Sequence, residues 1–140
     1  MSKATVAVPA LGSRVLAVCF AGQPDRDPVP ALLAAFRASP VSDHIVVALH
    51  ATAACSRHYA LAYGATVAVV GDLNGELEAA HASGCTGRPL SVVVDRLGAT
   101  VARVTEPEPA RHVHALTDAL TNARLSTPWC RRLTESVPTR

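Results

Sequence analysis

The sequence predicts a single α/β domain in which helices flank a central mixed sheet of about five strands. Short Val-rich apolar runs alternate with segments of helical spacing along most of the chain, and this alternation favours parallel strands joined by helices. Two further apolar runs follow with only a short turn between them, which indicates an antiparallel hairpin. A last segment with helical spacing closes the domain.

The expected strands are apolar runs bounded by turn-forming residues and too short for helices. Val supplies many of their side chains, and the runs at 14–20 and 44–50 are expected to be buried strands. The runs occupy residues 14–20, 44–50, 66–70, 90–95 and 99–104. Arg96, Leu97 and Gly98 form the turn of the predicted hairpin.

The first helix is predicted by a capping signal and a repeating apolar face. Asp27 has the side chain of an N-cap, and Pro28 suits the first turn. Pro40 ends the helix, because helical backbone is disfavoured before a proline. One face is apolar at positions i, i+3, i+4 and i+7, namely Val29, Leu32, Leu33 and Phe36.

The second helix is expected to begin after Thr52, a capping residue, and to end at Gly64, which favours left-handed backbone. Its expected apolar face consists of Cys55, Tyr59, Ala62 and Tyr63.

Two shorter signals mark the remaining helices. A short helix follows the turn at 71–75, and its expected apolar side carries Leu73, Leu77, Ala80 and His81. The last helix opens at residues 106–109, where two glutamates favour the positive end of the helix dipole. Its expected apolar face consists of Val113, Leu116 and Leu120.

Composition narrows the class of protein. The chain has 140 residues, 49% of them hydrophobic, which suits one domain at 1–125 and a C-terminal tail at 126–140. A net charge of +2 with interspersed signs predicts no nucleic-acid partner. No apolar run approaches the ~18 residues of a membrane span, and the N-terminus lacks the pattern of a signal peptide. We therefore expect a cytoplasmic protein without a membrane partner.

The four cysteines are Cys19, Cys55, Cys85 and Cys130, and no two form a CxxC pair. In a reducing cytosol we expect free thiols. No pattern in the sequence calls for a cofactor.

Two stretches resemble known redox proteins. Residues 62–84 place a Tyr63-Gly64 pair before a strand, an acidic turn and a short helix, and they resemble a segment of the alkyl hydroperoxide reductase/thiol-specific antioxidant (peroxiredoxin-like) family. Residues 87–98 resemble the stretch of thioredoxin-like proteins in which a cis-proline precedes a strand that ends in Asp. The resemblance implies a thioredoxin-like fold and identifies Pro89 with the cis-proline.

The sequence departs from this pattern at the reactive position. In the resembled families a cysteine lies after the first core strand, at the start of the first helix, where the helix N-terminus stabilises a thiolate. Residues 21–30 contain no cysteine. The peroxiredoxin pattern places Pro30 near the reactive position, whereas the CxxC pattern places Gly22 and Asp25 at the two sulfurs. Both alignments predict that the nucleophile is lost.

Other residues are alternative sites of chemistry. Cys85 precedes Pro89 and is the first thiol to test, while Cys55 falls in the first turn of the second helix but on its expected apolar face, so we favour a buried Cys55. His50 ends the second strand, at the edge where α/β proteins bind ligands. Cys55 and His58 together with His81 and Cys85 have zinc-ligand chemistry, but two of the four fall on apolar helix faces, so we expect no metal.

The favoured interpretation is a redox-degenerate protein that uses the former active-site groove. The groove residues would be Gly22, Gln23, Asp25, Arg26, Asp27, Arg88 and Pro89. It would bind a small molecule or a partner protein, with non-redox chemistry in a specialised biosynthetic pathway as one form of this role. The alternatives are a thiol oxidoreductase or peroxidase that uses Cys85 or Cys55, and a structural or interaction domain, including a homodimer through a sheet edge.

Overall fold

The computed structural model describes residues 15–82 and 89–125 and contains one five-stranded sheet in the order β3-β2-β1-β4-β5. The strands are β1 (Leu16–Gly22), β2 (Ile45–Leu49), β3 (Ala68–Gly71), β4 (Leu90–Val94) and β5 (Thr100–Val104). The helices are α2 (Val29–Phe36), α3 (Ala53–Ala62), α4 (Glu76–Ala82) and α5 (Pro109–Leu125), with a 3-10 turn η1 (Ser42–His44) before β2. Each predicted strand and helix is present, in the predicted order.

The sheet is mixed, as predicted. Strand β1 runs parallel to β2, and β2 runs parallel to β3. Strand β4 is antiparallel to both β1 and β5. The helical crossovers therefore build the parallel half, and the hairpin adds the antiparallel half.

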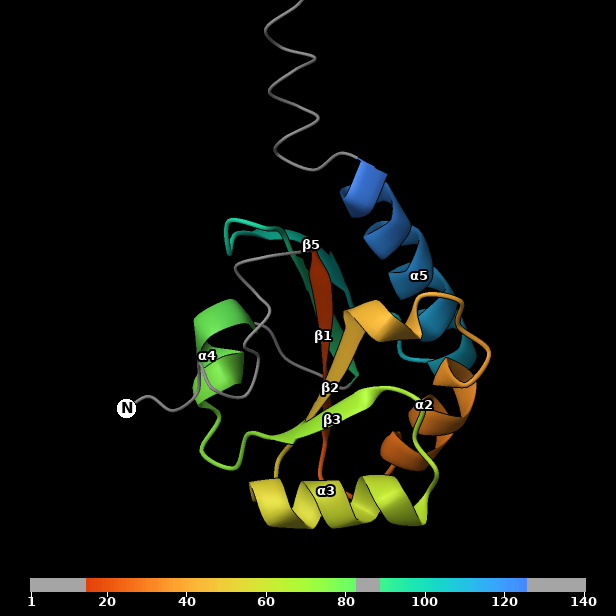
Figure 1. The fold of residues 1–140 in the computed structure, drawn as a ribbon, viewed down its shortest axis with the longest axis vertical. Helices are drawn as coiled ribbons and strands as arrows, with labels where there is room; N and C mark the ends of the chain where they lie inside the picture. Colours follow the sequence, from red (N-terminus) through yellow and green to blue (C-terminus); the bar gives the residue numbers. More distant parts are fainter. Residues whose placement is uncertain (1–14, 83–88, 126–140) are drawn as a thin grey trace, which may run out of the picture.

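Alternate side chains of β1 enter two separate hydrophobic cores. Ala17, Cys19 and Ala21 face the core that α2 and α5 cover. Leu16, Val18 and Phe20 face a second core, to which α4 contributes Leu77 and Ala82. Figure 1 shows α2 and α5 on one side of the sheet, α4 on the other, and α3 across the end at which β1 and β2 finish.

The start of α2 differs from the prediction. The N-cap position is Pro28 rather than Asp27, and no side chain caps it. The first helical N–H group, that of Val29, donates to the Arg26 carbonyl at 2.8 Å, and Pro30 has no N–H to satisfy. The first N–H groups of a helix have no acceptor within the helix. Two of these positions need no cap here, because Val29 already donates and Pro30 has no N–H, so the helix begins without an Asp27 cap.

Helix α3 has the predicted ends but a different buried face. Thr52 Oγ1 accepts a hydrogen bond from the Cys55 N–H at 3.1 Å, and Gly64 has a φ of 61°. The buried side chains, however, are Ser56 and Tyr59. The predicted face of Cys55, Ala62 and Tyr63 is exposed, because α3 contacts the end of the sheet along one narrow line of side chains.

Helix α4 is also rotated relative to the prediction. Leu77 and Ala82 are buried, whereas Leu73 and Ala80 are exposed. The Asp72 carboxylate fixes the start of this helix, because its two oxygens accept hydrogen bonds from the N–H groups of Leu77 and Glu78 at 2.9 and 3.0 Å. Capping by Asp72 satisfies orphan donors of the first turn.

The hairpin between β4 and β5 is closed by the buried Asp95, whose Oδ1 accepts the N–H groups of Leu97 and Ala99 at 2.9 and 3.0 Å. Gly98 supplies a φ of 89°, a backbone region that favours glycine.

A buried polar chain joins α5 to the sheet. His112 Nδ1 lies 2.8 Å from the Glu106 carbonyl oxygen, so this nitrogen carries the proton and donates. His112 Nε2 then accepts from the Ser91 hydroxyl at 2.7 Å. Ser91 and His112 are fully buried, and burial lowers the pKa of His112 while the Glu106 carbonyl opposes that shift. The imidazole is therefore held as its neutral form.

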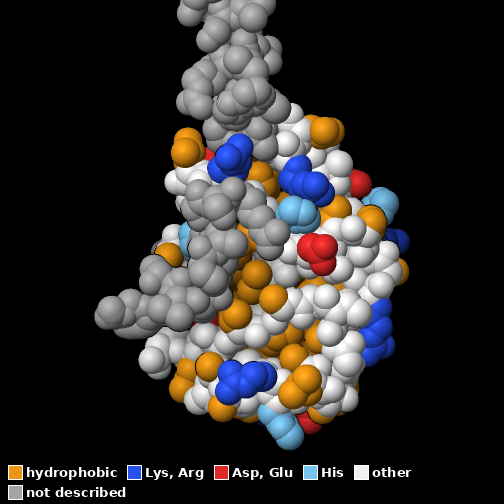
Figure 2. All heavy atoms as spheres, viewed as in Figure 1, with side chains coloured by type: hydrophobic (Ala, Val, Ile, Leu, Met, Phe, Trp, Pro, Cys, Tyr) orange, Lys and Arg blue, Asp and Glu red, His pale blue; other side chains and the backbone are white. Residues whose placement is uncertain are grey.

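No helix in the described ranges is long and apolar enough to cross a bilayer. On the face shown in Figure 2, basic and acidic side chains are interspersed.

The first prediction concerns Gly71, where α3 approaches the sheet. A Cβ on Gly71 would lie 2.6 Å from the Ala51 carbonyl oxygen and 2.6 Å from the Ala53 nitrogen, both of them backbone atoms. We expect Gly71→Ala to lower the free energy of unfolding by about 3 kcal/mol, measured by urea denaturation. Gly75→Ala is the control, because its Cβ would meet nothing within 4 Å and only a positive φ costs about 1 kcal/mol. Equal losses would contradict the close approach.

The second prediction concerns the pH dependence of stability. The folded pKa of His112 lies below its unfolded value of about 6.5, so the unfolded chain binds more protons as the pH falls through that value. Stability is therefore full above about pH 6.5 and decreases below it, by at most about 1.4 kcal/mol per pH unit for one proton. His81, whose pKa burial also lowers, acts in the same direction.

Urea denaturation between pH 8 and pH 5.5 measures this decrease. His112→Gln should reduce it, whereas His114→Gln, at an exposed position of the same helix, should not. A stability that is independent of pH across this range would contradict the interpretation.

Candidate functional site

The predicted groove lies at the edge of the sheet where β1 and β2 end. The His50 N–H donates to the Gly22 carbonyl at 2.8 Å, which brings the end of β2 to the end of β1. Phe20 pairs with Leu90, so Pro89, one residue before Leu90, reaches the same edge. Ligands of α/β proteins bind outside the carboxyl ends of the parallel strands. The structure therefore brings Gly22, His50 and Pro89 to the same edge of the sheet.

The loop between β1 and α2 supplies the remaining described residues of the groove. Gln23, Asp25, Arg26 and Asp27 are exposed. The loop turns tightly, because the Arg26 N–H donates to the Gln23 carbonyl at 3.3 Å and Asp25 has a φ of 68°. Asp is among the non-glycine residues that adopt this region most readily. The peptide bond between Asp27 and Pro28 is cis.

The Asp25 carboxylate contacts the end of α3. The Tyr63 hydroxyl donates to Asp25 Oδ1 at 2.8 Å, and the Tyr59 and Tyr63 rings lie with their centroids 4.4 Å apart. The Tyr59 hydroxyl is buried and lacks a hydrogen-bond partner among the described residues. The Asp25 backbone and the Tyr63 hydroxyl are nonetheless close enough to lower its pKa in part. We call Asp25, Tyr59 and Tyr63 the Tyr–Asp cluster.

Both phenols are held in the protonated form. The hydrogen bond to the Asp25 carboxylate raises the pKa of Tyr63, and the negative charge of that carboxylate raises it further. Burial raises the pKa of Tyr59. At neutral pH the cluster therefore presents two hydroxyl groups beside one carboxylate.

Arg37 fixes the same end of α3 from the other end of α2. Its guanidinium donates to the Tyr63 carbonyl. This contact holds Tyr63 in register with α2, whose preceding loop carries Asp25.

The cysteines do not assemble a thiol site in the described part of the chain. Cys19 is buried in the core, as expected. Cys55 is exposed, so the expectation of a buried Cys55 is wrong. The reason is that the buried line of α3 passes through Ser56 and Tyr59. Cys85 and Arg88 lie outside the described residues, and so does the bond that would make Pro89 a cis-proline.

Within residues 15–82 and 89–125, no group of three or more His, Cys, Asp or Glu side chains is placed to hold a metal ion. Cys85, one of the four residues of the zinc alternative, lies outside these ranges.

Sequence reasoning missed the Tyr–Asp cluster as a site. Tyr59 and Tyr63 appeared only as members of an apolar helix face. They are the only two tyrosines in the chain, and a spacing of four residues places both on one side of a helix. This pairing was the available signal, but nothing in the sequence indicates that the loop at 22–28 reaches it.

No protein-family model matches the sequence, and no curated protein matches it. Solved structures do resemble it. The bacterioferritin comigratory protein of Xanthomonas campestris, described for its alkyl peroxide reduction activity, is 14% identical with a TM-score of 0.62, and the match covers 84% of each chain. A Chlorobium tepidum protein described as the thiol:disulfide interchange protein DsbE is 18% identical with a TM-score of 0.60, covering 83% of this chain and 84% of that one.

A Bacteroides thetaiotaomicron protein described as a protein disulfide isomerase is 14% identical, with a TM-score of 0.66 and coverage of 89% of this chain and 82% of that one. At these identities the likeness defines the fold. The chain has a thioredoxin-like fold, with structural neighbours among peroxiredoxin Q and DsbE-like proteins, and the fold predicted from the sequence is confirmed.

The third prediction tests the Tyr–Asp cluster. Because the chain has two tyrosines, ultraviolet titration of phenolate formation reports on this cluster alone. Asp25→Asn removes the charge that raises the pKa of Tyr63, so the Tyr63 midpoint should fall. Asp27→Asn, in the same loop, is the control and should leave both midpoints in place. An unchanged midpoint in Asp25→Asn would contradict the contact.

Proposed function

We propose that this chain is a redox-degenerate thioredoxin-fold protein that binds a small molecule or a segment of a partner protein at the edge formed by residues 22–28, His50 and Pro89. The observation that carries the proposal is the Tyr–Asp cluster. A carboxylate of the loop in which the resembled families hold their reactive cysteine is bonded to one of two adjacent phenols.

The chemistry of the loop supports binding rather than thiol redox chemistry. Residues 21–30 contain no cysteine, and a carboxylate cannot form a disulfide or be oxidised to a sulfenic acid. The exposed side chains of this loop are polar or charged. They are suited to hydrogen bonding and to charge recognition.

The cluster also defines the kind of group that would bind. The Tyr59 hydroxyl is buried and lacks a hydrogen-bond partner among the described residues, and an unmet buried hydroxyl costs about 1–3 kcal/mol. A ligand atom reaches this hydroxyl only when the exposed loop at 22–28 shifts, and an atom that then accepts its hydrogen bond would remove this cost. The Asp25 carboxylate beside it accepts hydrogen bonds from a donor. We therefore infer a ligand with an acceptor and a donor close together, as in an amide or a peptide backbone.

The cellular location belongs to the same proposal: we place this function in the cytoplasm, as expected from the sequence. Non-redox chemistry in a specialised biosynthetic pathway is one form that it would take.

The fourth prediction uses a capped glycine dipeptide amide and acetamide as probes, followed by NMR of the 15N-labelled chain. We expect saturable shifts at residues 22–28, His50 and 59–64. Tyr59→Phe should weaken binding about tenfold, which corresponds to the ~1.4 kcal/mol of one hydrogen bond. Leu61→Ala is the control, because Leu61 lies on the same helix and is 78% exposed. Binding that is equal in Tyr59→Phe and wild type, or absent for both probes, would contradict the proposal.

A second candidate function is supported by Cys55. Its side chain is exposed in the first turn of α3, so the thiol is open to an oxidant, and its N–H is fixed by Thr52. This arrangement fits a thiol oxidoreductase with a relocated cysteine.

Consumption of hydrogen peroxide in the presence of dithiothreitol separates the two functions. Our proposal expects the same slow rate for wild type and for Cys55→Ser. A rate that falls in Cys55→Ser would favour the second candidate, and Cys85→Ser tests the other relocated thiol in the same way.

A further inference from the structure

A pocket of ≈ 330 Å³ lies between the end of α2 and the first turns of α5, away from the Tyr–Asp cluster. This volume is at the lower end of the ~300–1,000 Å³ that small-molecule sites have. Its walls include Ala35 from α2, Ala38 from the turn that follows α2, and Val113 from α5. The small alanine side chains leave room for a ring between the two helices.

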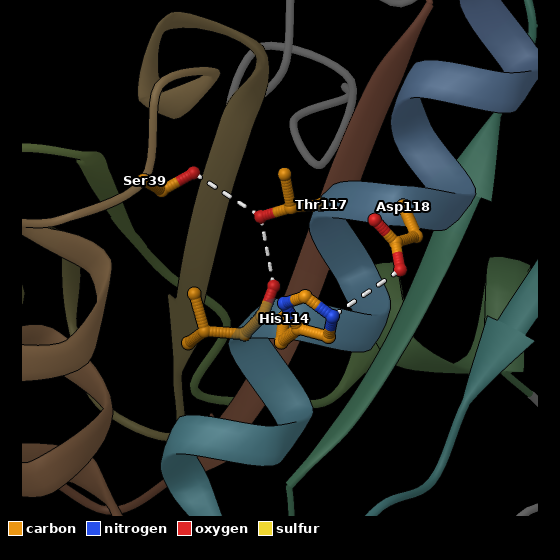
Figure 3. Close-up of polar contacts among 5 residues, drawn as sticks. Ser39, His114, Thr117 and Asp118 are labelled. Carbon is orange, nitrogen blue, oxygen red and sulfur yellow. Dashed lines mark hydrogen bonds and ion pairs between the residues drawn. The ribbon is translucent and has the colours of Figure 1, made fainter.

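The hydroxyls that line this pocket already use their protons (Figure 3). Thr117 Oγ1 donates to the Val113 carbonyl at 2.8 Å. Ser39 Oγ lies 3.3 Å from Thr117 Oγ1, and Ser39 must be the donor there because Thr117 has only one hydroxyl proton. Ser39 Oγ also accepts the Val41 N–H at 3.3 Å. Each hydroxyl oxygen therefore keeps one lone pair and no proton for a ligand.

His114 lies at the mouth of the pocket and is turned away from it at one nitrogen. Its Nε2 lies 3.5 Å from Asp118 Oδ2, and Figure 3 shows this nitrogen turned to the carboxylate. His114 lines the pocket and Asp118 does not.

Two hydroxyls that offer only acceptors to the pocket select a ligand that donates. A charged ammonium group would lose its hydration without a carboxylate in the lining, which is costly, whereas a neutral hydroxyl would not. We propose that this pocket binds a small neutral aromatic alcohol of the phenol class, with its ring between the alanine and valine walls and its hydroxyl donating to Ser39 or Thr117. This inference does not rest on the function proposed above.

The fifth prediction compares phenol with anisole, in which a methyl group replaces the hydroxyl proton. In NMR titrations of the full chain, phenol should give saturable shifts at residues 35–40 and 110–117, and anisole should bind at least tenfold more weakly. Ser39→Ala removes one acceptor, and Thr117→Val removes the other. Phenol has one hydroxyl proton, so the variant that removes its acceptor should weaken phenol several-fold while the other should not. Anisole binding should stay unchanged in both variants, which separates a lost acceptor from a folding defect.

Two leucine variants test the location. Ala38→Leu fills the pocket from an exposed position at its rim and should abolish phenol binding. Ala34→Leu, at an exposed position of α2 outside the pocket, should not change phenol binding. Equal binding of phenol and anisole would overturn the proposal. So would the absence of saturable binding, or phenol shifts confined to the Tyr–Asp cluster.

Discussion

Strand β1 is the constraint on which the rest of the structure depends. It pairs with β2 on one edge and with β4 on the other, and its side chains alternate between the two cores. Residues 15–21 are all buried. A strand with no exposed side and no free edge has one register available to it, because a shift by one residue would exchange the two cores. The end of β1 is thereby fixed, and so is the start of the loop that carries Asp25.

The fixed position of that loop explains why a change of side chain there leaves the fold intact. The loop side chains are exposed, so the cores do not depend on whether a thiol or a carboxylate stands in the loop. A thioredoxin-like fold supplies a rigid edge, and the chemistry at the edge depends on a few residues of one turn. In this chain those residues are acidic and basic groups, and Asp25 is bonded to a tyrosine from another helix.

The elements that sequence patterns identified best are those whose side chains are buried on a whole face. The buried strands and the apolar face of α5 repeat one kind of residue at a fixed spacing, and each lies where the pattern indicated. Helix α3 was oriented wrongly because only Ser56 and Tyr59 are buried on it. A serine in the core gives no apolar signal, so the pattern favoured Cys55 instead. The partners of the site, Asp25 and Tyr63, are 38 residues apart, and only the packing of α3 on the end of the sheet brings them together.

Helix α2 explains how a loop and a distant helix end form one rigid site. It has eight residues, which at 1.5 Å per residue span about 12 Å. The loop before it contacts Tyr63 through the hydroxyl, and Arg37 after it contacts Tyr63 through the carbonyl. The side chain and the backbone of Tyr63 are thus held by opposite ends of one helix, whose buried face is fixed by Val29, Leu32, Leu33 and Phe36. The Tyr63 hydroxyl can leave Asp25 only if the Tyr63 ring rotates away from Tyr59 or if α2 moves within the core. The geometry of the cluster is therefore determined by the packing of α2 as well as by the exposed loop.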